Sequence, residues 1–468
     1  MNKFIGRANE LKHLNDSYNK DQFQMTVIYG RRRVGKTFLI NEFIKDKKSV
    51  YFMATNTSYQ DNFRAFSKTV LSQLSNDMSG MSFDTTEDLF SFFTRVCQNE
   101  KIVIVIDELP YIAEENKNFL SLMQKFIDQQ WINTKMFLIL CGSSISFMED
   151  EVLSQKSPIF GRKTSQINLQ PFSYKEAAEF TPNYSSEEKA ICYGITGGIA
   201  RYLSLIDESL TLDENIVSLF FSKMGYLYEE PNNLLSQEFR NVPTYANVIS
   251  AIAAGSNKLS ELTDKCNIDS DHLSHILNAL IRVEIVEKNV AITDEKNKKK
   301  SMYSLKDGMF RFWYRFVQPA TSSIETGMGS SFYYNAVKPL LNDYMSVIFE
   351  KMCQQYTLIE GLSGRLSCFV TQVGKWWGSN PRLKEQTDID VVGIDTINNK
   401  AILGECKFKN SVIDKSIFED LKSRDNLIDK RYTTCQFILF SKAGFSKYLI
   451  ENAENENIKL VTLDDLYH

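Results

Sequence analysis

The segment GRRRVGKT at positions 30–37 constrains the fold of this chain more than any other feature. The apolar run MTVIY ends directly before it, and residues 37–45 have apolar positions at helical spacing. The segment therefore fits GxxxxGK followed by Ser or Thr between a strand and a helix, the setting of a phosphate-binding loop. Its backbone N–H groups would face phosphate oxygens, the lysine would neutralise the β- and γ-phosphates, and the threonine would bind Mg²⁺. We expect ATP to contact Gly30, Arg31, Arg32, Arg33, Val34, Gly35, Lys36, Thr37 and Phe38.

A second apolar run, at residues 102–106, ends in Asp107 and Glu108. An ordinary buried strand that ends in solvated carboxylates is one interpretation. The phosphate loop earlier in the chain favours another, in which Asp107 holds Mg²⁺ through water and Glu108 polarises the water that attacks the γ-phosphate. We therefore predict Lys36 and Glu108 as catalytic residues, and Thr37 and Asp107 as the residues that hold the metal.

Two further apolar runs, at residues 49–54 and 137–141, indicate strands separated by helical patterns. Continuous apolar strands that alternate with helices predict an α/β fold with a parallel sheet covered on both faces. After the last run, the Ser143 hydroxyl could sense the γ-phosphate or orient water, or it could belong to a plain polar turn. Arg162 could reach a phosphate of the same or a neighbouring subunit, or it could be an ordinary surface arginine.

The length and composition set outer bounds on the protein. A chain of 468 residues exceeds the roughly 250 to 300 that one core supports, so we expect two to four domains. Its 54 Lys and Arg residues nearly balance its 58 Asp and Glu residues, so any nucleic-acid surface would be a local patch. Eight scattered cysteines and four histidines argue against structural zinc or a disulfide framework. Without a signal core or a long apolar stretch, we expect a cytoplasmic chain with no membrane partner.

The middle of the chain is predicted to be helical after residue 172, with an interruption at Gly197-Gly198. Three helices and two short strands then follow in the order of a winged helix, at residues 245–254, 259–265, 270–283, 285–290 and 301–305. The third helix would enter a DNA major groove, and the lysines of KNKKK at 296–300 would touch phosphates. That helix has a single arginine, Arg282, beside Asp271 and Glu284, which makes a poor recognition face.

Three charged residues of the C-terminal part are predicted to converge. Asp390 is on one expected strand, and Glu405 and Lys407 are two residues apart on the next, so their side chains leave the same face. A hairpin would bring all three together. Two carboxylates and a lysine can hold Mg²⁺ and position the attacking water of a phosphodiesterase. An exposed hairpin with ordinary charges is the alternative interpretation.

This pattern resembles the PD-(D/E)xK restriction-endonuclease-like fold. In that resemblance Glu350, on the preceding long helix, matches the acidic residue that many such nucleases have on their first core helix. The resemblance implies that Glu350, Asp390 and Glu405 hold the metal and that Asp390, Glu405 and Lys407 are catalytic. A nuclease fold kept only for binding or packing is a third interpretation.

Several segments resemble the AAA+/STAND-class ATPases found predominantly in archaea and also in bacteria, namely FIGRANELKHL, VIYGRRRVGKTFLINEF, VIVIDELPYI, LILCGSS and GITGGIARYL. The resemblance implies that Gly6-Arg7 lies near the adenine and that Gly197-Gly198 begins a helical lid, although the family usually has proline in place of Ala200. In this class a winged helix often packs within the molecule. VGKWWGSN, TDIDVVGID, LGECKFKN and FSKAGFS resemble the C-terminal domain that accompanies this family.

We therefore expect a P-loop ATPase domain at residues 1–168, a helical lid at 169–240, a winged helix at 241–308 and a restriction-endonuclease-like domain at 309–468. The first functional hypothesis is an ATP-hydrolysing protein, with ATP and Mg²⁺ as cofactors, that controls a nuclease-like or DNA-binding C-terminal domain. The alternative is a signalling switch whose nucleotide state governs homo-oligomerisation or partner binding without cleavage.

Overall fold

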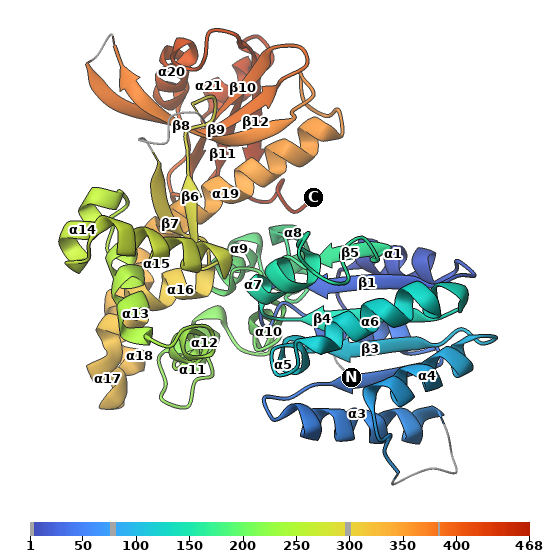
Figure 1. The fold of residues 1–468 in the computed structure, drawn as a ribbon. Helices are drawn as coiled ribbons and strands as arrows, with labels where there is room; N and C mark the ends of the chain where they lie inside the picture. The colour runs from blue at the N-terminus through green and yellow to red at the C-terminus, as the bar shows by residue number, and fades with distance from the viewer. Residues whose placement is uncertain (1–3, 75–80, 295–300, 382–383) are drawn as a thin grey trace. The chain divides into compact units, whose positions relative to one another are not determined.

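The computed structural model describes residues 4–74, 81–294, 301–381 and 384–468 (Figure 1). The chain forms two compact units. Unit 1 comprises Met1–Pro171 and Ile199–Arg201, and unit 2 comprises Phe172–Gly198 and Tyr202–His468. The chain thus leaves unit 2 after Gly198, contributes three residues to unit 1 and returns at Tyr202.

Unit 1 is built on a parallel sheet of five strands in the order β2-β3-β4-β1-β5. This confirms the predicted α/β fold class and its four expected strands. The sequence did not predict β5, because SQIN is polar and buries only Ile167, as a short edge strand can. The strands are β1 (Gln24–Tyr29), β2 (Ser49–Met53), β3 (Val103–Asp107), β4 (Phe137–Gly142) and β5 (Ser165–Asn168).

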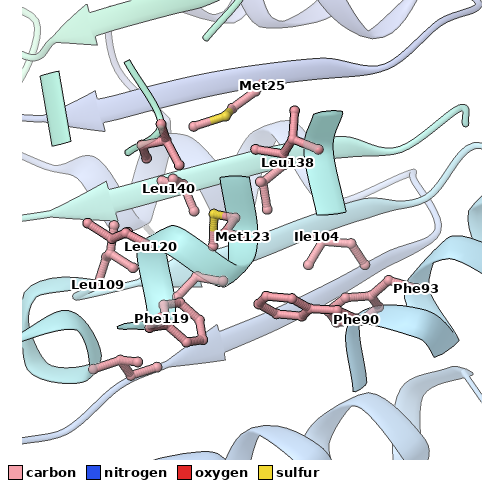
Figure 2. Packing of buried hydrophobic residues seen from close by; sticks show 14 of the residues in the cluster. Met25, Phe90, Phe93, Ile104, Leu109, Phe119, Leu120, Met123, Leu138 and Leu140 are labelled. Atoms are coloured by element: carbon pink, nitrogen blue, oxygen red, sulfur yellow. The ribbon is translucent and has the colours of Figure 1, made fainter. Parts of the chain in front are cut away.

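Helices cover both faces of this sheet because successive strand residues point to opposite sides. Ile28, Val105 and Ile139 pack with Leu39 of the helix that follows the phosphate loop. Residues of the opposite register meet a second group of helices, as Figure 2 shows for Ile104, Leu138, Phe90 and Met123. The helices of unit 1 are α1 (Ala8–Tyr18), α2 (Lys36–Ile44), α3 (Tyr59–Leu74), α4 (Thr86–Cys97), α5 (Pro110–Ala113), α6 (Asn118–Gln129) and α7 (Ile145–Phe147).

Unit 2 begins with helices on either side of Gly197-Gly198, whose positive φ angles of 63° and 72° end the first helical run as predicted. The three helices and the hairpin expected at residues 245–305 are present. The whole KNKKK segment at residues 296–300 lies outside the described residues. The elements are α8 (Tyr174–Ala178), α9 (Ser186–Thr196), α11 (Leu212–Phe220), α12 (Glu230–Glu238), α13 (Val242–Ala253), α14 (Leu259–Cys266), α15 (Ser270–Arg282), β6 (Val286–Asn289) and β7 (Met302–Leu305). The short helix α10 (Ala200–Leu203) is shared, since its first two residues belong to unit 1.

The C-terminal part of unit 2 contains a second five-stranded sheet in the order β12-β11-β10-β9-β8. Strands β8, β9 and β10 are antiparallel neighbours, whereas β10, β11 and β12 are parallel. The sequence did not predict β8 or β12. In β8 the apolar residues are interrupted by Lys375 and two glycines. The strands are β8 (Gln372–Asn380), β9 (Glu385–Asp395), β10 (Lys400–Lys407), β11 (Thr433–Ser441) and β12 (Ile458–Thr462).

A long helix, α19 (Leu341–Leu362), precedes this sheet. Residues 333–340 before it form π and 3-10 turns, because Pro339 has no backbone N–H for a regular α-helix. The remaining helices of unit 2 are α16 (Gly308–Phe312), α17 (Thr321–Glu325), α18 (Gly329–Phe332), α20 (Lys415–Ser423) and α21 (Lys447–Asn452). In the parts of the chain that the structure describes, no helix is both long and apolar enough to span a membrane.

The β6–β7 hairpin packs against the C-terminal sheet. Ile292, just after β6, is only 6% exposed and belongs to the same apolar core as Trp376 and Ile389. Its N–H donates to the carbonyl of Lys375 in β8 at 3.0 Å. Glu287 of β6 also forms an ion pair with Lys351 of α19. The described part of the hairpin therefore makes the intramolecular contacts that the resemblance implied for a packing module.

Phe90 provides a test of the unit 1 core. Its ring is fully buried and lies 5.0 Å from Trp131 and 5.4 Å from Phe126. We expect Phe90→Ala to lower the free energy of unfolding of unit 1 by about 3 to 5 kcal/mol, since it removes an aromatic side chain and leaves a cavity. Urea denaturation followed by circular dichroism measures this. Phe160→Ala, at a ring that is 44% exposed, is the control; an equal loss in both variants would contradict this description of the core.

Candidate nucleotide site and acidic cluster

The phosphate loop has the curled backbone that its glycines permit. Gly30 and Gly35 have φ angles of 144° and 103°, and a Cβ on Gly30 would lie 2.5 Å from the carbonyl oxygen of Leu169. Lys36 Nζ donates to the carbonyls of Gly30 at 2.8 Å and Arg31 at 3.0 Å. Burial lowers the pKa of Lys36, although the nearby carboxylates of Glu108 and Asp107 oppose this effect. The loop backbone therefore curls around the ammonium group of its own lysine.

Asp107 ends β3 and faces the first residues of α2. Thr37 Oγ1 donates to Asp107 Oδ2 at 3.0 Å, and the Tyr51 hydroxyl donates to the same oxygen at 2.5 Å. The N–H of Glu108 donates to the other oxygen, Oδ1, at 2.9 Å. Burial, reinforced by the Asp107 charge, raises the pKa of Tyr51 well above its usual range, so the phenol keeps its proton. Thr37 and Asp107 offer adjacent hard oxygen donors, which fit Mg²⁺.

Glu108 and Ser143 meet where β3 and β4 end side by side. The Ser143 hydroxyl lies 2.7 and 2.8 Å from the two carboxylate oxygens of Glu108, and the Ser143 N–H donates to Oε2 at 3.2 Å. Glu108 also has a positive φ angle of 52°, which turns its side chain from the strand direction. Both predicted residues thus lie at the carboxyl ends of the strands, where the phosphate loop also lies. The hydrogen bonds from Ser143 fix the position of the Glu108 carboxylate.

Other predicted residues support the loop from its flanks. Arg7 is buried, and its Nη2 donates to the carbonyl of Val34 at 3.1 Å. The Phe38 ring stacks on Phe4 with centroids 5.6 Å apart. The N–H of Arg201 donates to the carbonyl of Arg33 at 3.2 Å. The sequence did not predict these contacts of Arg201 and Tyr51, since the Arg201 contact is made by its backbone N–H and a strand tyrosine gives no motif signal.

Arg162 does not lie at the phosphate loop of its own chain, and this part of the expectation is wrong. Its neighbour Thr164 donates to the carbonyl of Met25, at the beginning of β1, whereas the loop follows the end of β1. The guanidinium forms two hydrogen bonds to the Asp128 carboxylate, at 2.8 and 2.7 Å. The arginine thus lies near the amino ends of the parallel strands, whereas the phosphate loop lies at their carboxyl ends. A role towards a neighbouring subunit stays a prediction.

The C-terminal residues Asp390, Glu405 and Lys407 do converge. The β9–β10 ladder ends at the pair Val391 and Gly404, and beyond it the N–H of Cys406 donates to Asp390 Oδ2 at 3.1 Å. Lys407 Nζ lies 2.6 Å from Glu405 Oε1. Arg424 Nη2 lies 2.9 Å from the other oxygen of Glu405. Burial and the Asp390 charge raise the pKa of Glu405.

Lys375 of β8 lies among the remaining carboxylates of this cluster. Its Nζ is 2.9 Å from Glu350, 2.8 Å from Asp388 and 3.1 Å from Asp390. Burial and the neighbouring Asp390 raise the pKa of Glu350 to about 7, although the ammonium opposes this. The sequence contained no signal for this lysine, since its strand was not predicted.

The predicted metal set Glu350, Asp390 and Glu405 is not assembled as a ligand set. Within residues 4–74, 81–294, 301–381 and 384–468, no group of three or more His, Cys, Asp or Glu side chains is arranged to hold a metal. The physical reason is that buried carboxylates need counter-charges, and here Lys375, Lys407 and Arg424 supply them. We call Glu350, Asp388, Asp390, Glu405 and these three cations the acidic cluster.

Comparison with known proteins identifies the family. Residues 4–206 match a family described as an ATPase domain predominantly from Archaea, and residues 313–424 match one described as archaeal and bacterial proteins of unknown function. The uncharacterized protein MJECL04 of Methanocaldococcus jannaschii is 31% identical over 466 residues, which cover 99% of each chain. The chain belongs to this archaeal-type ATPase family.

Two further similarities agree with a P-loop ATPase. The uncharacterized ATP-binding protein MJ0423 of the same organism is 44% identical over 45 residues, covering 10% of this ATPase and 76% of that protein. The structure of the Walker-type ATPase PABY2304 of Pyrococcus abyssi matches with a TM-score of 0.51 and 16% identity, covering 67% of this ATPase and 96% of that chain. At this identity the second likeness shows the fold alone.

The catalytic assignment of Glu108 can be tested directly. We expect Glu108→Gln to reduce kcat for ATP hydrolysis by about 10² or more, because an amide cannot accept the proton of the attacking water. Nucleotide affinity should stay within a few-fold, since Lys36 and the loop backbone are untouched. Steady-state hydrolysis and equilibrium binding of a fluorescent ATP analogue measure the two effects. The exposed Glu115→Gln is the control, and an unchanged kcat for Glu108→Gln would refute the assignment.

Proposed function

We propose that this ATPase is a nucleotide-controlled switch whose output is the acidic cluster, a Mg²⁺-dependent phosphodiesterase site that acts on nucleic acid. The observation that carries the proposal is the position of Tyr344 on α19. Its buried hydroxyl lies 2.9 Å from the carbonyl oxygen of Gly194 in α9 and 3.1 Å from that of Gly308. Tyr344 thereby ties the helix before Gly197-Gly198 to the helix that carries Glu350.

The chain itself joins the phosphate loop to this tyrosine. Residues 199–201 belong to unit 1, where the Arg201 N–H is bonded to the loop carbonyl of Arg33. They follow Gly197-Gly198 in the chain, and a Cβ on Gly197 would lie 2.9 Å from the backbone nitrogen of Gly308, so the backbones are in close contact. A change of the loop on ATP binding would therefore act through residues 199–201 on the end of α9 and on Tyr344.

Adjacent residues of α19 would pass this movement to the acidic cluster. Glu350 contacts the ammonium of Lys375, and Lys351 pairs with Glu287 of the β6–β7 hairpin. Ile292, beyond the same hairpin strand, is bonded to the backbone of Lys375. A shift of α19 would thus move two of the groups that keep the Lys375 ammonium among the carboxylates.

The cluster has the residue types that hydrolysis of a phosphodiester requires. Asp390 and Glu405 would hold Mg²⁺ once Lys375 moves away from Asp390 and Lys407 or Arg424 moves away from Glu405. Lys407 would then orient the attacking water. The metal, when bound, would supply stabilisation of the developing negative charge. In this proposal the internal cations keep the site closed, and the ATP state decides when Mg²⁺ replaces them.

The second candidate function is a switch without cleavage, in which the C-terminal sheet binds or packs. One observation favours it: Glu350, Asp390 and Glu405 each already have a cationic partner. A charge-balanced cluster of this kind is stable without metal. Its output would be a change of oligomeric state or partner between the ADP and ATP forms.

A cleavage assay separates the two candidates. We expect the wild-type protein to cut at least one of single-stranded, double-stranded or branched DNA or RNA with Mg²⁺ or Mn²⁺, at a rate that depends on ATP. Cleavage should be abolished in Glu405→Ala/Lys407→Ala and should lose its ATP dependence in Lys36→Ala. Lys415→Ala/Glu419→Ala, which removes an exposed ion pair of α20, is the matched control. ATP hydrolysis without any cleavage would refute the nuclease proposal and favour the second candidate.

We also propose that Arg162 serves the nucleotide of a neighbouring copy of the chain. It lines a surface hollow beside Ile132 and Phe160, which are 56% and 44% exposed, as side chains in protein interfaces often are when the partner is absent. Arg162→Ala should lower kcat by roughly 10³-fold or more. Mixing it with Lys36→Ala chains should restore part of the activity, because a contact in which the loop of an Arg162→Ala chain meets the arginine of a Lys36→Ala chain is complete. A mixture no more active than its two components would contradict the proposal.

A further inference from the structure

Tyr51 is a polar residue of the nucleotide site that no motif of this chain assigns. It lies in the middle of β2, which pairs in parallel with β3, and its register partner is Val105. From there the side chain extends towards the end of β3, where its hydroxyl donates to Asp107 Oδ2 at 2.5 Å. The Tyr51 backbone is fixed as well, since its N–H donates to the side chain of Gln73 at 3.1 Å.

The contacts of the Asp107 carboxylate explain why this hydroxyl matters. Asp107 is 1% exposed, so its orientation depends on protein donors. Oδ1 is held by the N–H of Glu108, and Oδ2 receives Thr37 from the α2 side and Tyr51 from the β2 side. Thr37 would also ligate Mg²⁺ through its oxygen. Tyr51 would then be a side-chain donor of Asp107 that has no direct bond to the metal, as is the buried thiol of Cys141.

The chemical type of the donor is also significant. A carboxylate that helps to hold Mg²⁺ must keep its negative charge and its orientation. A lysine or arginine at this position would supply a competing positive charge, as Lys375 does in the acidic cluster. A phenol supplies one directed hydrogen bond and no charge. Partners of this kind, one step removed from the metal, typically change metal affinity or activity by 10- to 100-fold.

We propose that Tyr51 is a positioning residue of the ATPase reaction, whose hydroxyl holds the Asp107 carboxylate in the orientation that receives the magnesium of MgATP. Tyr51 contributes to Mg²⁺ recognition and not to binding of the nucleotide itself. This role of Tyr51 concerns the ATPase activity alone and is independent of the proposed role of the acidic cluster.

The test compares the dissociation constant of a fluorescent ATP analogue in EDTA with that in MgCl₂. The ratio of the two constants measures how much Mg²⁺ strengthens binding. For Tyr51→Phe we expect this ratio to fall about tenfold or more, with the constant in EDTA unchanged within twofold. Hydrolysis should need more Mg²⁺ for half-maximal rate, while kcat at saturating Mg²⁺ stays within about threefold, since the loss is one of metal recognition.

Two controls distinguish this role from a structural one. Tyr59→Phe removes a hydroxyl bonded to Thr86 elsewhere in unit 1 and should leave the ratio unchanged. In an Asp107→Asn background, Tyr51→Phe should have little further effect on the ratio, because the hydroxyl acts through the carboxylate. An unchanged ratio in Tyr51→Phe would overturn the proposal. An equal loss of affinity in EDTA and in MgCl₂ would also overturn it, because that result assigns Tyr51 to the fold and not to the metal.

Discussion

The buried carboxylate of Asp107 is the group around which the nucleotide site is organised. It would be costly to bury without partners, and it obtains them from Thr37 of α2, Tyr51 of β2, the thiol of Cys141 in β4 and the backbone N–H of Glu108. These bonds fix the first turn of α2 against the end of β3, which sets the phosphate loop beside the acidic strand end. The bond between Glu108 and Ser143 then joins the neighbouring strand β4. The arrangement of the phosphate loop and of the ends of β3 and β4 thus depends on the hydrogen bonds of the Asp107 carboxylate.

The acidic cluster also contains buried carboxylates, but their charges are compensated in a different way. The carboxylates of Glu350, Asp390 and Glu405 are largely buried, and they are balanced by the charges of Lys375, Lys407 and Arg424 instead of by hydroxyl groups. Removing one cation from such a cluster leaves a buried charge without compensation, so movement of Lys375 requires a replacement. Under the proposed function that replacement is Mg²⁺. The two sites therefore differ in how their carboxylate charges are compensated. Neutral donors leave the charge of Asp107 available to a metal ion, whereas lysine and arginine side chains neutralise the carboxylates of the acidic cluster.

The sequence predicted the parts of the fold that depend on local pattern. The loop glycines, the apolar strands and the Asp107-Glu108 pair were recognisable, because each needs particular residue types at fixed spacing. The same holds for Asp390, Glu405 and Lys407, whose strand periodicity placed them on one face. Tyr51 and Lys375 could not be predicted, because their roles come from side chains that cross from one strand to another. The position of Arg162 was not predicted correctly, because sequence spacing does not say at which end of the parallel strands a residue lies. Strand β5 was too short and too polar to recognise.

We propose that the nucleotide state reaches the acidic cluster through residues 199–201, α9 and α19. Hydrogen–deuterium exchange of the full chain, bound to ADP or to a non-hydrolysable ATP analogue, tests this coupling. We expect different exchange rates in the two states for the amide of Ile292, which is bonded to Lys375, and for the amides of β8. These differences should be absent in Lys36→Ala. Identical exchange of Ile292 and β8 in both nucleotide states, with a clear difference at the phosphate loop, would contradict the coupling.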